Sequence, residues 1–404
     1  MKLLYIIPSF QHPNVRGPTR HYHFVRELSE RHAITLLVLN RSEVEREALE
    51  DVASHVEALH LFDIYDSSHA TVADWAGRIP LAGRRLEQML RLRNGIQRMT
   101  ATLTQLLSEK SHDLIVFHGK SVFPVIADCR DLPIVVDFCD ATSMRIRSKM
   151  RFSSLLKRPL LWLRSAEIRR IEQSILHKTP HIAFISPRDR EAILGRAGQA
   201  EILPNGVDHE YWRRQSSPSD KNCIVFTGVM DYAPNDDAAM FLIEQIAPRI
   251  RQSIPDLELL IVGRSPSAVL KQTAAREPNV TVTGFVDDMR PYLERGAVFA
   301  APLRYASGTQ NKVLEALAMG VPTVTTSIVA DGLRTDASDK PPVCVADGEA
   351  DFAAEVVRLL QNAGDRSLLA IRGRQFVEHH FVWSRSAEKL ERMCLAALEQ
   401  KSSD

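Results

Sequence analysis

The sequence has no hydrophobic run long enough to cross a bilayer, which takes roughly 20 consecutive apolar residues. Its first apolar segment, from Leu3 to Ile7, is too short for a signal peptide, and no small-residue cleavage site follows it. Cysteines are also few: the five are far apart and never form the close pair that zinc or redox chemistry needs. We therefore expect a soluble or peripheral protein of the reducing cytoplasm, with buried thiols.

An excess of charge of either sign is missing as well. Lys and Arg number 51 and Asp and Glu number 50, so the formal net charge is +1. That balance gives no overall argument for nucleic acid, and we expect no such partner. The three spaced glycines of a dinucleotide-binding loop are absent, which counts against a nicotinamide dehydrogenase. The Gly-x-Ser-x-Gly motif that carries the nucleophilic serine of α/β-hydrolases is absent too, which counts against a hydrolase with a catalytic triad.

Short apolar runs alternate with longer amphipathic stretches, which is the pattern of βαβ units and a parallel sheet. The rhythm occurs twice, and at 404 residues the chain exceeds what one core usually organises. We therefore predict two doubly wound, Rossmann-like α/β domains that face each other across a cleft. The expected strands are Leu3 to Ile7, Ile34 to Leu39, Leu114 to Phe117, Ile134 to Phe138 and His181 to Ile185, then Ile224 to Thr227, Leu257 to Val262, Val280 to Thr283, Val298 to Pro302 and Val321 to Thr325.

The domain boundary is predicted at the turn-rich stretch Pro204 to Asp208, which a polar segment with Ser and Pro follows. The first domain then covers residues 1–204 and the second covers residues 205–382. In residues 383–404 apolar side chains recur at helical spacing after the second domain is complete. We expect this last helix to return to the first domain.

Residues just after the strands deserve inspection, because ligands of open parallel sheets bind beyond the carboxyl ends of the strands. Gly17 follows the first strand and lets a ligand approach the backbone where a helix begins. After the strand Val298 to Pro302 comes Gly308, with a helix expected to begin near Thr309.

The amides of that helix's first turn are suited to a diphosphate, with Lys312 and Arg304 as countercharges. Glu315, nearly two turns in, is placed to accept hydrogen bonds from ribose hydroxyls.

Several motifs together resemble the nucleotide-binding half of the family 4 glycosyltransferases, which have the two-domain GT-B architecture. The resemblance covers most of the chain. The segments that carry it are Phe226 to Gly228, Leu203 to Asp208, Leu260 to Gly263, Val282 to Val286 and, above all, Glu315 to Pro322.

The resemblance implies transfer from a nucleotide diphosphate-sugar with retention of anomeric configuration, without a bound metal ion or other cofactor. The absence of an Asp-x-Asp motif agrees. It further implies that Asn205 sits at the hinge and that His118 is the cleft histidine near the transferred sugar. The expected catalytic residues are His118, Lys312 and Arg304, and the expected donor-binding residues are Gly17, Gly228, Arg264, Ser307, Gly308, Thr309, Gln310 and Glu315.

The chain departs from the family pattern at two places. Ser307 occupies the first position of the family's usual pair of glutamates. The stretch Gly228 to Asp231 offers no Arg or Lys where many members place both for the phosphates. Arg304, Lys312 or Arg264 must then supply the charge. Members similar to this variant serve exopolysaccharide or cell-envelope pathways, so a glycan or a lipid-linked sugar is the expected acceptor.

Residues 145–170 hold nine Lys and Arg against the single acid Glu167, a local net charge of +8, with Leu, Phe and Trp between them. A basic segment with an apolar face is suited to the anionic inner face of the cell membrane. The alternative is a long solvated helix that covers the first sheet.

Two other functions fit the same sequence. Sugar-nucleotide 2-epimerases share the architecture and donors, and would release a new sugar nucleotide without any acceptor. A non-catalytic subunit would bind the donor and turn over nothing, which Ser307 and the missing Arg-Lys pair suggest.

Overall fold

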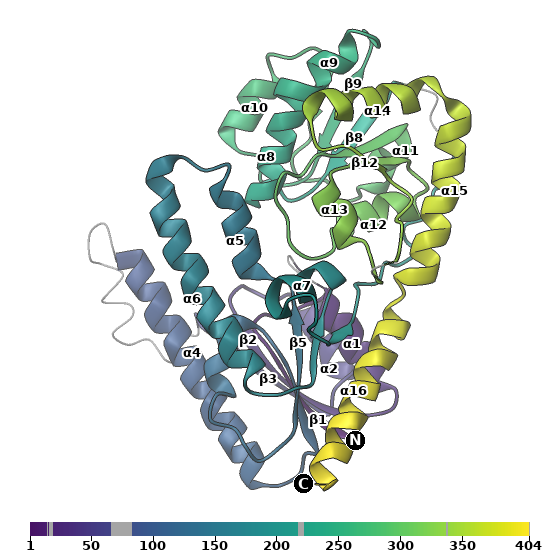
Figure 1. Ribbon diagram of the computed structural model, residues 1–404. Coiled ribbons are helices and arrows are strands. Elements are labelled where there is room, and N and C mark those ends of the chain that lie inside the picture. Colours follow the sequence, from purple (N-terminus) through teal and green to yellow (C-terminus); the bar gives the residue numbers. More distant parts are fainter. Residues whose placement is uncertain (14, 16–18, 66–82, 217–221, 337, 404) are drawn as a thin grey trace.

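The computed structural model describes residues 1–13, 15, 19–65, 83–216, 222–336 and 338–403. They form two α/β domains, each built on a parallel sheet (Figure 1). The first sheet has seven strands in the order β3-β2-β1-β4-β5-β6-β7, and the second has six in the order β10-β9-β8-β11-β12-β13. The strands of the first sheet are β1 Lys2–Ile7, β2 Ala33–Asn40, β3 Ala58–Asp63, β4 Leu114–His118, β5 Ile134–Cys139, β6 Ile182–Phe184 and β7 Glu201–Ile202. Those of the second are β8 Cys223–Thr227, β9 Glu258–Val262, β10 Val280–Val282, β11 Val298–Ala301, β12 Thr323–Thr325 and β13 Cys344–Val345.

Helices cover both faces of each sheet, as expected for doubly wound domains. The helices of the first domain are α1 Arg20–Ser29, α2 Arg46–Ser54, α4 Gly83–Ser108, α5 Thr142–Met150, α6 Arg158–Leu176 and α7 Pro187–Leu194, with 3₁₀ turns η2 Lys120–Val125 and η3 Leu155–Lys157. The second domain has α8 Ala233–Phe241, the π turn η4 Leu242–Ile246, α9 Ala247–Arg251, α10 Ala268–Ala274, α11 Arg290–Arg295, α12 Asn311–Ala318, α13 Ser327–Gly332, α14 Glu349–Gln361 and α15 Ala363–His380. The last helix is α16 Trp383–Ser403.

The side chains of strand β1 show why helices cover both faces of the first sheet. Successive side chains of a strand point to opposite faces, and here all of them from Leu3 to Ile7 are buried. Leu3, Tyr5 and Ile7 enter a core with α1, α2 and α16, whereas Leu4 and Ile6 enter another with α4, η2 and α7. A continuous apolar strand therefore needs helices on both sides, which is typical of central parallel strands.

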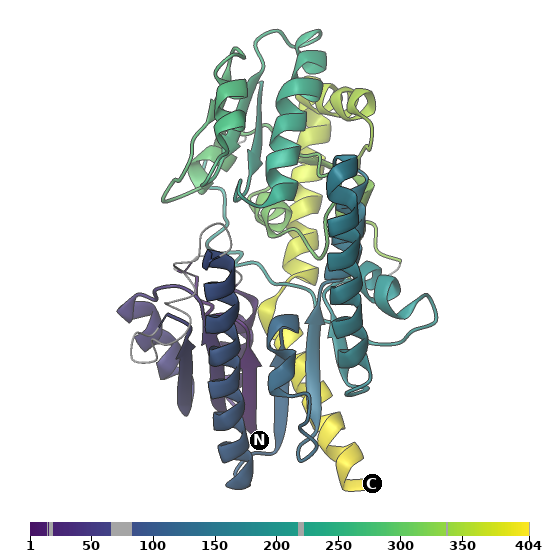
Figure 2. The ribbon, with the colours of Figure 1, turned by 90° about the vertical axis from the view of Figure 1, so that its left-hand side faces the viewer.

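The last helix, α16, packs on the first domain although it follows the second in sequence. Its apolar side chains join the core of α1, and Trp383 stacks on His23 with ring centroids 4.4 Å apart. Figures 1 and 2 show α15 and α16 running along both domains. Among the described helices, none is long and apolar enough to cross a membrane.

Residues 142–176 do not form the single long helix that the sequence analysis gave as the alternative to a membrane-binding segment. They form a hairpin of α5 and α6 joined through η3, which rises beside the second domain (Figures 1 and 2). The ring of Phe152, at the end of α5, stacks on Tyr305 of the second domain with centroids 5.8 Å apart. The hairpin therefore contacts both domains.

Candidate functional site

The two sheets direct the carboxyl ends of their central strands toward the same seam between the domains. His118 ends β4 and Asp140 follows β5 in the first domain. In the second domain, residues 302–310 connect β11 to α12. Ligand sites of parallel sheets form at this edge, and the hydrogen bond from the Ser307 hydroxyl to the Asp140 carboxylate, 2.6 Å long, joins the two loops there.

The loop before α12 has a fixed shape. Gly308 has φ +65°, the left-handed region that favours glycine, and its N–H donates to the Asp189 carboxylate at 3.3 Å. The hydroxyl of Thr309 donates to the Gly332 carbonyl at 2.9 Å. These bonds hold residues 308–309 in a loop, and the helix begins two residues after Thr309, at Asn311, close to the predicted start.

The first turn of α12 leaves backbone donors free. Within the described chain, the amide groups of residues 309–312 have no hydrogen-bond acceptor. The amino end of a helix also carries a partial positive charge, so these amides are suited to bind an anion. The amide of Gly308 is excluded from the set, because Asp189 already accepts its hydrogen.

Lys312 and Glu315 lie on α12 beside these amides. The Lys312 ammonium donates to the Gln310 side-chain oxygen at 2.9 Å. Burial lowers the pKa of Lys312 to about 8, against the opposing attraction of Glu315. Burial likewise raises the pKa of Glu315 to about 7, although the Lys312 charge opposes the shift. Near neutral pH the pair therefore holds a cation and a carboxyl group that is partly ionised.

Two glycines let the loops after β8 and β9 pack against each other, and one of them lies beside α12. A Cβ atom on Gly263 would lie 1.8 Å from the Gly228 carbonyl oxygen, so only glycine fits there. A Cβ atom on Gly228 would lie 3.3 Å from Cε of Lys312. Gly228 thus lets the lysine side chain pass close to the backbone, and Arg264 directly follows Gly263 at the same edge.

Arg304 does not fit the role of a free countercharge. Its Nε and Nη2 donate to the two carboxylate oxygens of Asp237 at 2.9 and 2.5 Å. Its guanidinium also lies over the rings of Phe152 and Phe241. Asp237 therefore already pairs this charge, and the role of Arg304 toward a diphosphate stays a prediction.

His118 is held in one orientation. Its Nδ1 lies 2.8 Å from the Asp137 carbonyl oxygen, so this nitrogen carries the hydrogen and Nε2 remains an acceptor. Burial lowers the pKa of His118, and although Asp137 opposes the shift, the ring is neutral near pH 7. The His21 ring lies against it with centroids 4.1 Å apart.

A buried polar chain links this histidine pair to the second domain. Arg20 donates from Nε and Nη2 to both oxygens of Asp137, at 2.6 and 3.2 Å. It also donates to the Asn205 side-chain oxygen at 2.9 Å. Asn205 in turn donates to Asn311 at 2.6 Å. The predicted hinge residue therefore contacts the first-domain charge pair and the first residue of α12.

Within the described residues, His21, His118 and Asp137 form one group whose ligand atoms lie within 4.8 Å of one another. The spacing is that of a metal site, but both Asp137 oxygens already accept bonds from the Arg20 guanidinium. A divalent cation would be repelled by that charge. Metal-free transfer therefore stays a prediction.

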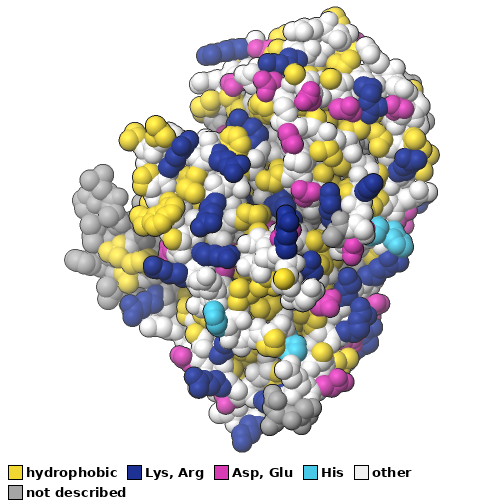
Figure 3. All heavy atoms as spheres, viewed as in Figure 1, with side chains coloured by type: hydrophobic (Ala, Val, Ile, Leu, Met, Phe, Trp, Pro, Cys, Tyr) yellow, Lys and Arg dark blue, Asp and Glu magenta, His cyan; other side chains and the backbone are white. Residues whose placement is uncertain are grey.

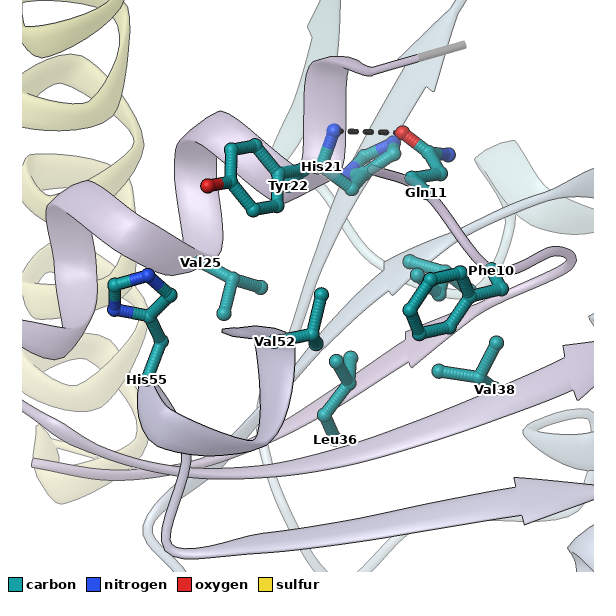
Figure 4. A pocket seen from close by; sticks show the side chains of 10 residues that line it. Phe10, Gln11, His21, Tyr22, Val25, Leu36, Val38, Val52 and His55 are labelled. Atoms are coloured by element: carbon teal, nitrogen blue, oxygen red, sulfur yellow. Dashed lines mark hydrogen bonds between the residues drawn. The ribbon is translucent and has the colours of Figure 1, made fainter. Parts of the chain in front are cut away.

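The loop after β1 packs inward where it is described. Phe10 and Gln11 lie over β2 and α1, and the Gln11 side chain accepts a hydrogen bond from the His21 backbone at 2.8 Å (Figure 4). They line an apolar cavity of about 10 Å³, which has room for about one water molecule and not for a nucleotide. Gly17, predicted to bind the donor, lies outside the described residues.

Comparison with known proteins agrees with this arrangement. Residues 221–362 match the family model of glycosyl transferases group 1. Among solved structures, HepE of Anabaena in complex with UDP and glucose aligns with a TM-score of 0.65 and 12% identity, over 98% of this chain and 100% of that one. Sucrose-phosphate synthase of Thermosynechococcus elongatus aligns with a TM-score of 0.70 and 17% identity, over 98% of this chain and 99% of that one. TarM of S. aureus aligns with a TM-score of 0.69 and 10% identity, over 97% of this chain and 98% of that one.

No protein of curated function matches the sequence. At these low identities the solved structures establish the fold, which is the two-domain GT-B architecture. The family match, in contrast, covers the domain that holds α12 and its preceding loop. Together the fold and the family match support a glycosyltransferase of the GT-B type.

Proposed function

We propose that this chain transfers a hexose from a nucleoside diphosphate-sugar to a hydroxyl of a glycan or lipid-linked acceptor, with retention of anomeric configuration and without a metal ion. The observation that carries the proposal is the first turn of α12, where free amides, Lys312 and Glu315 converge at the seam. The diphosphate takes the amides and the ammonium, while Glu315 takes the ribose. HepE is described with UDP-glucose bound, which makes that compound the first donor to try.

In this mechanism the difficult step is departure of the nucleoside diphosphate. The bond from the anomeric carbon to the phosphate oxygen breaks, and the amides and Lys312 stabilise the negative charge that develops. The acceptor hydroxyl attacks from the same face, and a phosphate oxygen takes its proton. His118 offers its Nε2 to a sugar hydroxyl, and closure of the domains excludes water that would hydrolyse the donor.

Glu315→Gln is expected to raise the donor Kd about tenfold or more and to change kcat little. A neutral amide accepts weaker hydrogen bonds from the ribose hydroxyls than a carboxylate does, and the ribose does not react. Isothermal titration with the donor, together with steady-state rates, measures both quantities. Glu388→Gln, at an exposed carboxylate of α16, is the matched control.

The pH profile gives a second readout of the same residue. In the wild type kcat/KM rises as pH passes about 7, where the Glu315 carboxylate forms, and falls as pH passes about 8, where the Lys312 ammonium is lost. Glu315→Gln removes the acidic limb and moves the basic limb to lower pH, because the carboxylate no longer raises the pKa of Lys312. An unchanged acidic limb in the variant would remove Glu315 from the donor site.

The proposed acceptor side is the membrane surface. Large apolar side chains are exposed around η3 and the start of α6, and Leu155 and Leu156 expose 74% and 94% of their surface. Figure 3 shows hydrophobic side chains gathered at the left-hand edge over this hairpin, with Lys and Arg among them. An apolar tip with basic neighbours is suited to anionic lipid, where a lipid-linked sugar would be presented.

We expect the full chain to sediment with vesicles that contain phosphatidylglycerol, less so at high salt, and not with phosphatidylcholine alone. Replacing Leu155, Leu156 and Leu160 together by Ser lowers the partition coefficient about tenfold or more, because the side chains lose apolar contact with the bilayer. Ile371→Ser, at an exposed position of α15, is the control. Equal sedimentation of the triple variant and the wild type would defeat the membrane assignment.

The function itself is tested with a panel of UDP-, GDP- and ADP-sugars. One of them is expected to raise the unfolding temperature in proportion to the logarithm of its concentration. Incubation with that donor and membrane extract should then release the free nucleoside diphosphate and a glycosylated product. A new sugar nucleotide formed without acceptor would indicate an epimerase, and binding without turnover would indicate a non-catalytic subunit.

A further inference from the structure

Two loops of the second domain lack charged side chains that a donor site needs. Ser307 offers a hydroxyl and no carboxylate, and residues 228–231 offer no Lys or Arg. The structure places a charged segment of the first domain, Asp140 to Arg145, directly opposite both loops. Its two ends contact different parts of the second domain.

Asp140 lies against the loop that precedes α12. Its carboxylate accepts hydrogen bonds from the Ser307 hydroxyl at 2.6 Å and from the Thr142 hydroxyl at 2.8 Å. A Cβ atom on Gly308 would lie 3.6 Å from Cβ of Asp140. The side chain keeps 28% of its surface exposed, so acceptor sites remain for a ligand. A carboxylate therefore stands within hydrogen-bond distance of Ser307, although it comes from the other domain.

The carboxylate is held in place and ionised. Lys120 donates to the Asp140 carbonyl at 2.8 Å and lies 3.5 Å from its side chain. Cys139, the preceding residue, has φ +62°, a left-handed backbone that is strained for a residue other than glycine. Burial alone would raise the pKa of Asp140, but the charges of Lys120 and Arg145 and two hydrogen bonds outweigh it and lower the pKa to about 2.

Arg145 lies against the other loop. Its guanidinium carbon is 5.5 Å from the ring centroid of Tyr232, which ends the loop that begins at Gly228. The Nε atom of Arg145 is buried and has no hydrogen-bond partner in the described part of the chain. The same loop contacts Lys312 through Gly228. A cation of the first domain therefore stands beside the loop that lacks one.

We propose that Asp140 and Arg145 complete the donor site from the first domain, Asp140 by accepting hydrogen bonds from hydroxyls of the transferred sugar and Arg145 by binding the diphosphate. This inference rests on the proposed function and deepens it. The donor site then has the Asp140 carboxylate and the Arg145 guanidinium only when the two domains are in contact, because both side chains belong to the first domain.

The test is a ligand series of nucleoside monophosphate, nucleoside diphosphate and diphosphate-glucose, titrated into the full chain by calorimetry, with uridine, guanosine and adenosine members. Asp140→Asn is expected to raise the ratio of the diphosphate-glucose Kd to the diphosphate Kd about tenfold or more, since a charged hydrogen bond is lost. Arg145→Gln is expected to raise the ratio of the diphosphate Kd to the monophosphate Kd by a similar factor.

Adding Ser307→Glu to Asp140→Asn moves the carboxylate to the second domain and should restore part of the sugar-dependent ratio. Asp256→Asn, at an exposed carboxylate before β9, should change neither ratio. If the wild type binds a diphosphate but both variants keep its two ratios, this inference fails and the proposed function stands. If no nucleotide of the series binds the wild type, the proposed function fails as well.

Discussion

Lys312→Ala is expected to lower kcat by about 10²- to 10³-fold while the donor KM changes far less. The loss is the size found when one preorganised donor to a developing anion is removed. The ammonium lies beside the first-turn amides of α12 in a half-buried site, where water screens its charge poorly. Initial rates at saturating donor measure kcat, and a donor titration measures KM.

Lys271→Ala is the matched control, since Lys271 is exposed on α10 of the same domain. Its kinetic constants should equal those of the wild type. A Lys312→Ala enzyme whose KM rises while kcat is retained would assign the lysine to ground-state binding. Unchanged kinetics in that variant would exclude it from the site.

Asp137→Ala is expected to cost about 3–5 kcal/mol of unfolding free energy in the first domain, the usual loss when one partner of a buried ion pair is removed. Asp137 is fully buried and Arg20 is 4% exposed, so the guanidinium would keep its charge without an ionic partner, with only the neutral oxygens of Asn205 and Leu203 as acceptors. Urea denaturation followed by circular dichroism measures the loss as a shift, to lower urea concentration, of the transition in which the first domain unfolds.

A double variant separates charge from packing. Replacing Arg20 by Met and Asp137 by Leu removes both charges and is expected to destabilise less than Asp137→Ala alone, because no buried charge stays unpaired. Asp256→Ala, at an exposed position, is the control and should shift the transition little. A single variant that loses less than about 1 kcal/mol would contradict the role given to this pair.

The sequence predicted the central strands because their apolar runs leave few alternatives. Leu3 to Ile7 and Leu114 to Phe117 are continuous apolar segments, and both are strands buried in the centre of the first sheet. Three strands were missed: β3, β7 and β13. Strand β3 reads Ala-Leu-His-Leu-Phe-Asp and is mostly half-buried, while β7 and β13 have only two residues each. At a sheet edge the pairing partner defines a strand more than its own composition does.

The residues of the candidate site likewise fall into those that local sequence indicates and those that only the fold brings together. Gly308, Lys312 and Glu315 all follow the strand that ends at Ala301 and lie within seven positions of one another, so local spacing was sufficient to propose them. Asp140 also follows a predicted strand, Ile134 to Phe138, so the same rule about strand ends applies to it. The partner of Arg304, in contrast, is Asp237, far away in sequence. No local pattern predicts such a pairing.

The buried histidines illustrate the limit further. His21 lies in the first turn of α1. The fold nevertheless brings it to His118 and Asp137, which are about a hundred residues away along the chain. Strand order in a parallel sheet creates these neighbours, and sequence spacing does not contain that order.

A crystal structure of the chain soaked with the tightest-binding nucleotide sugar tests the central claim most directly. We predict the diphosphate against the amides of residues 309–312 and the Lys312 ammonium, with the ribose hydroxyls on Glu315. A donor bound at any other place, with the first turn of α12 empty at saturating ligand, would contradict the account.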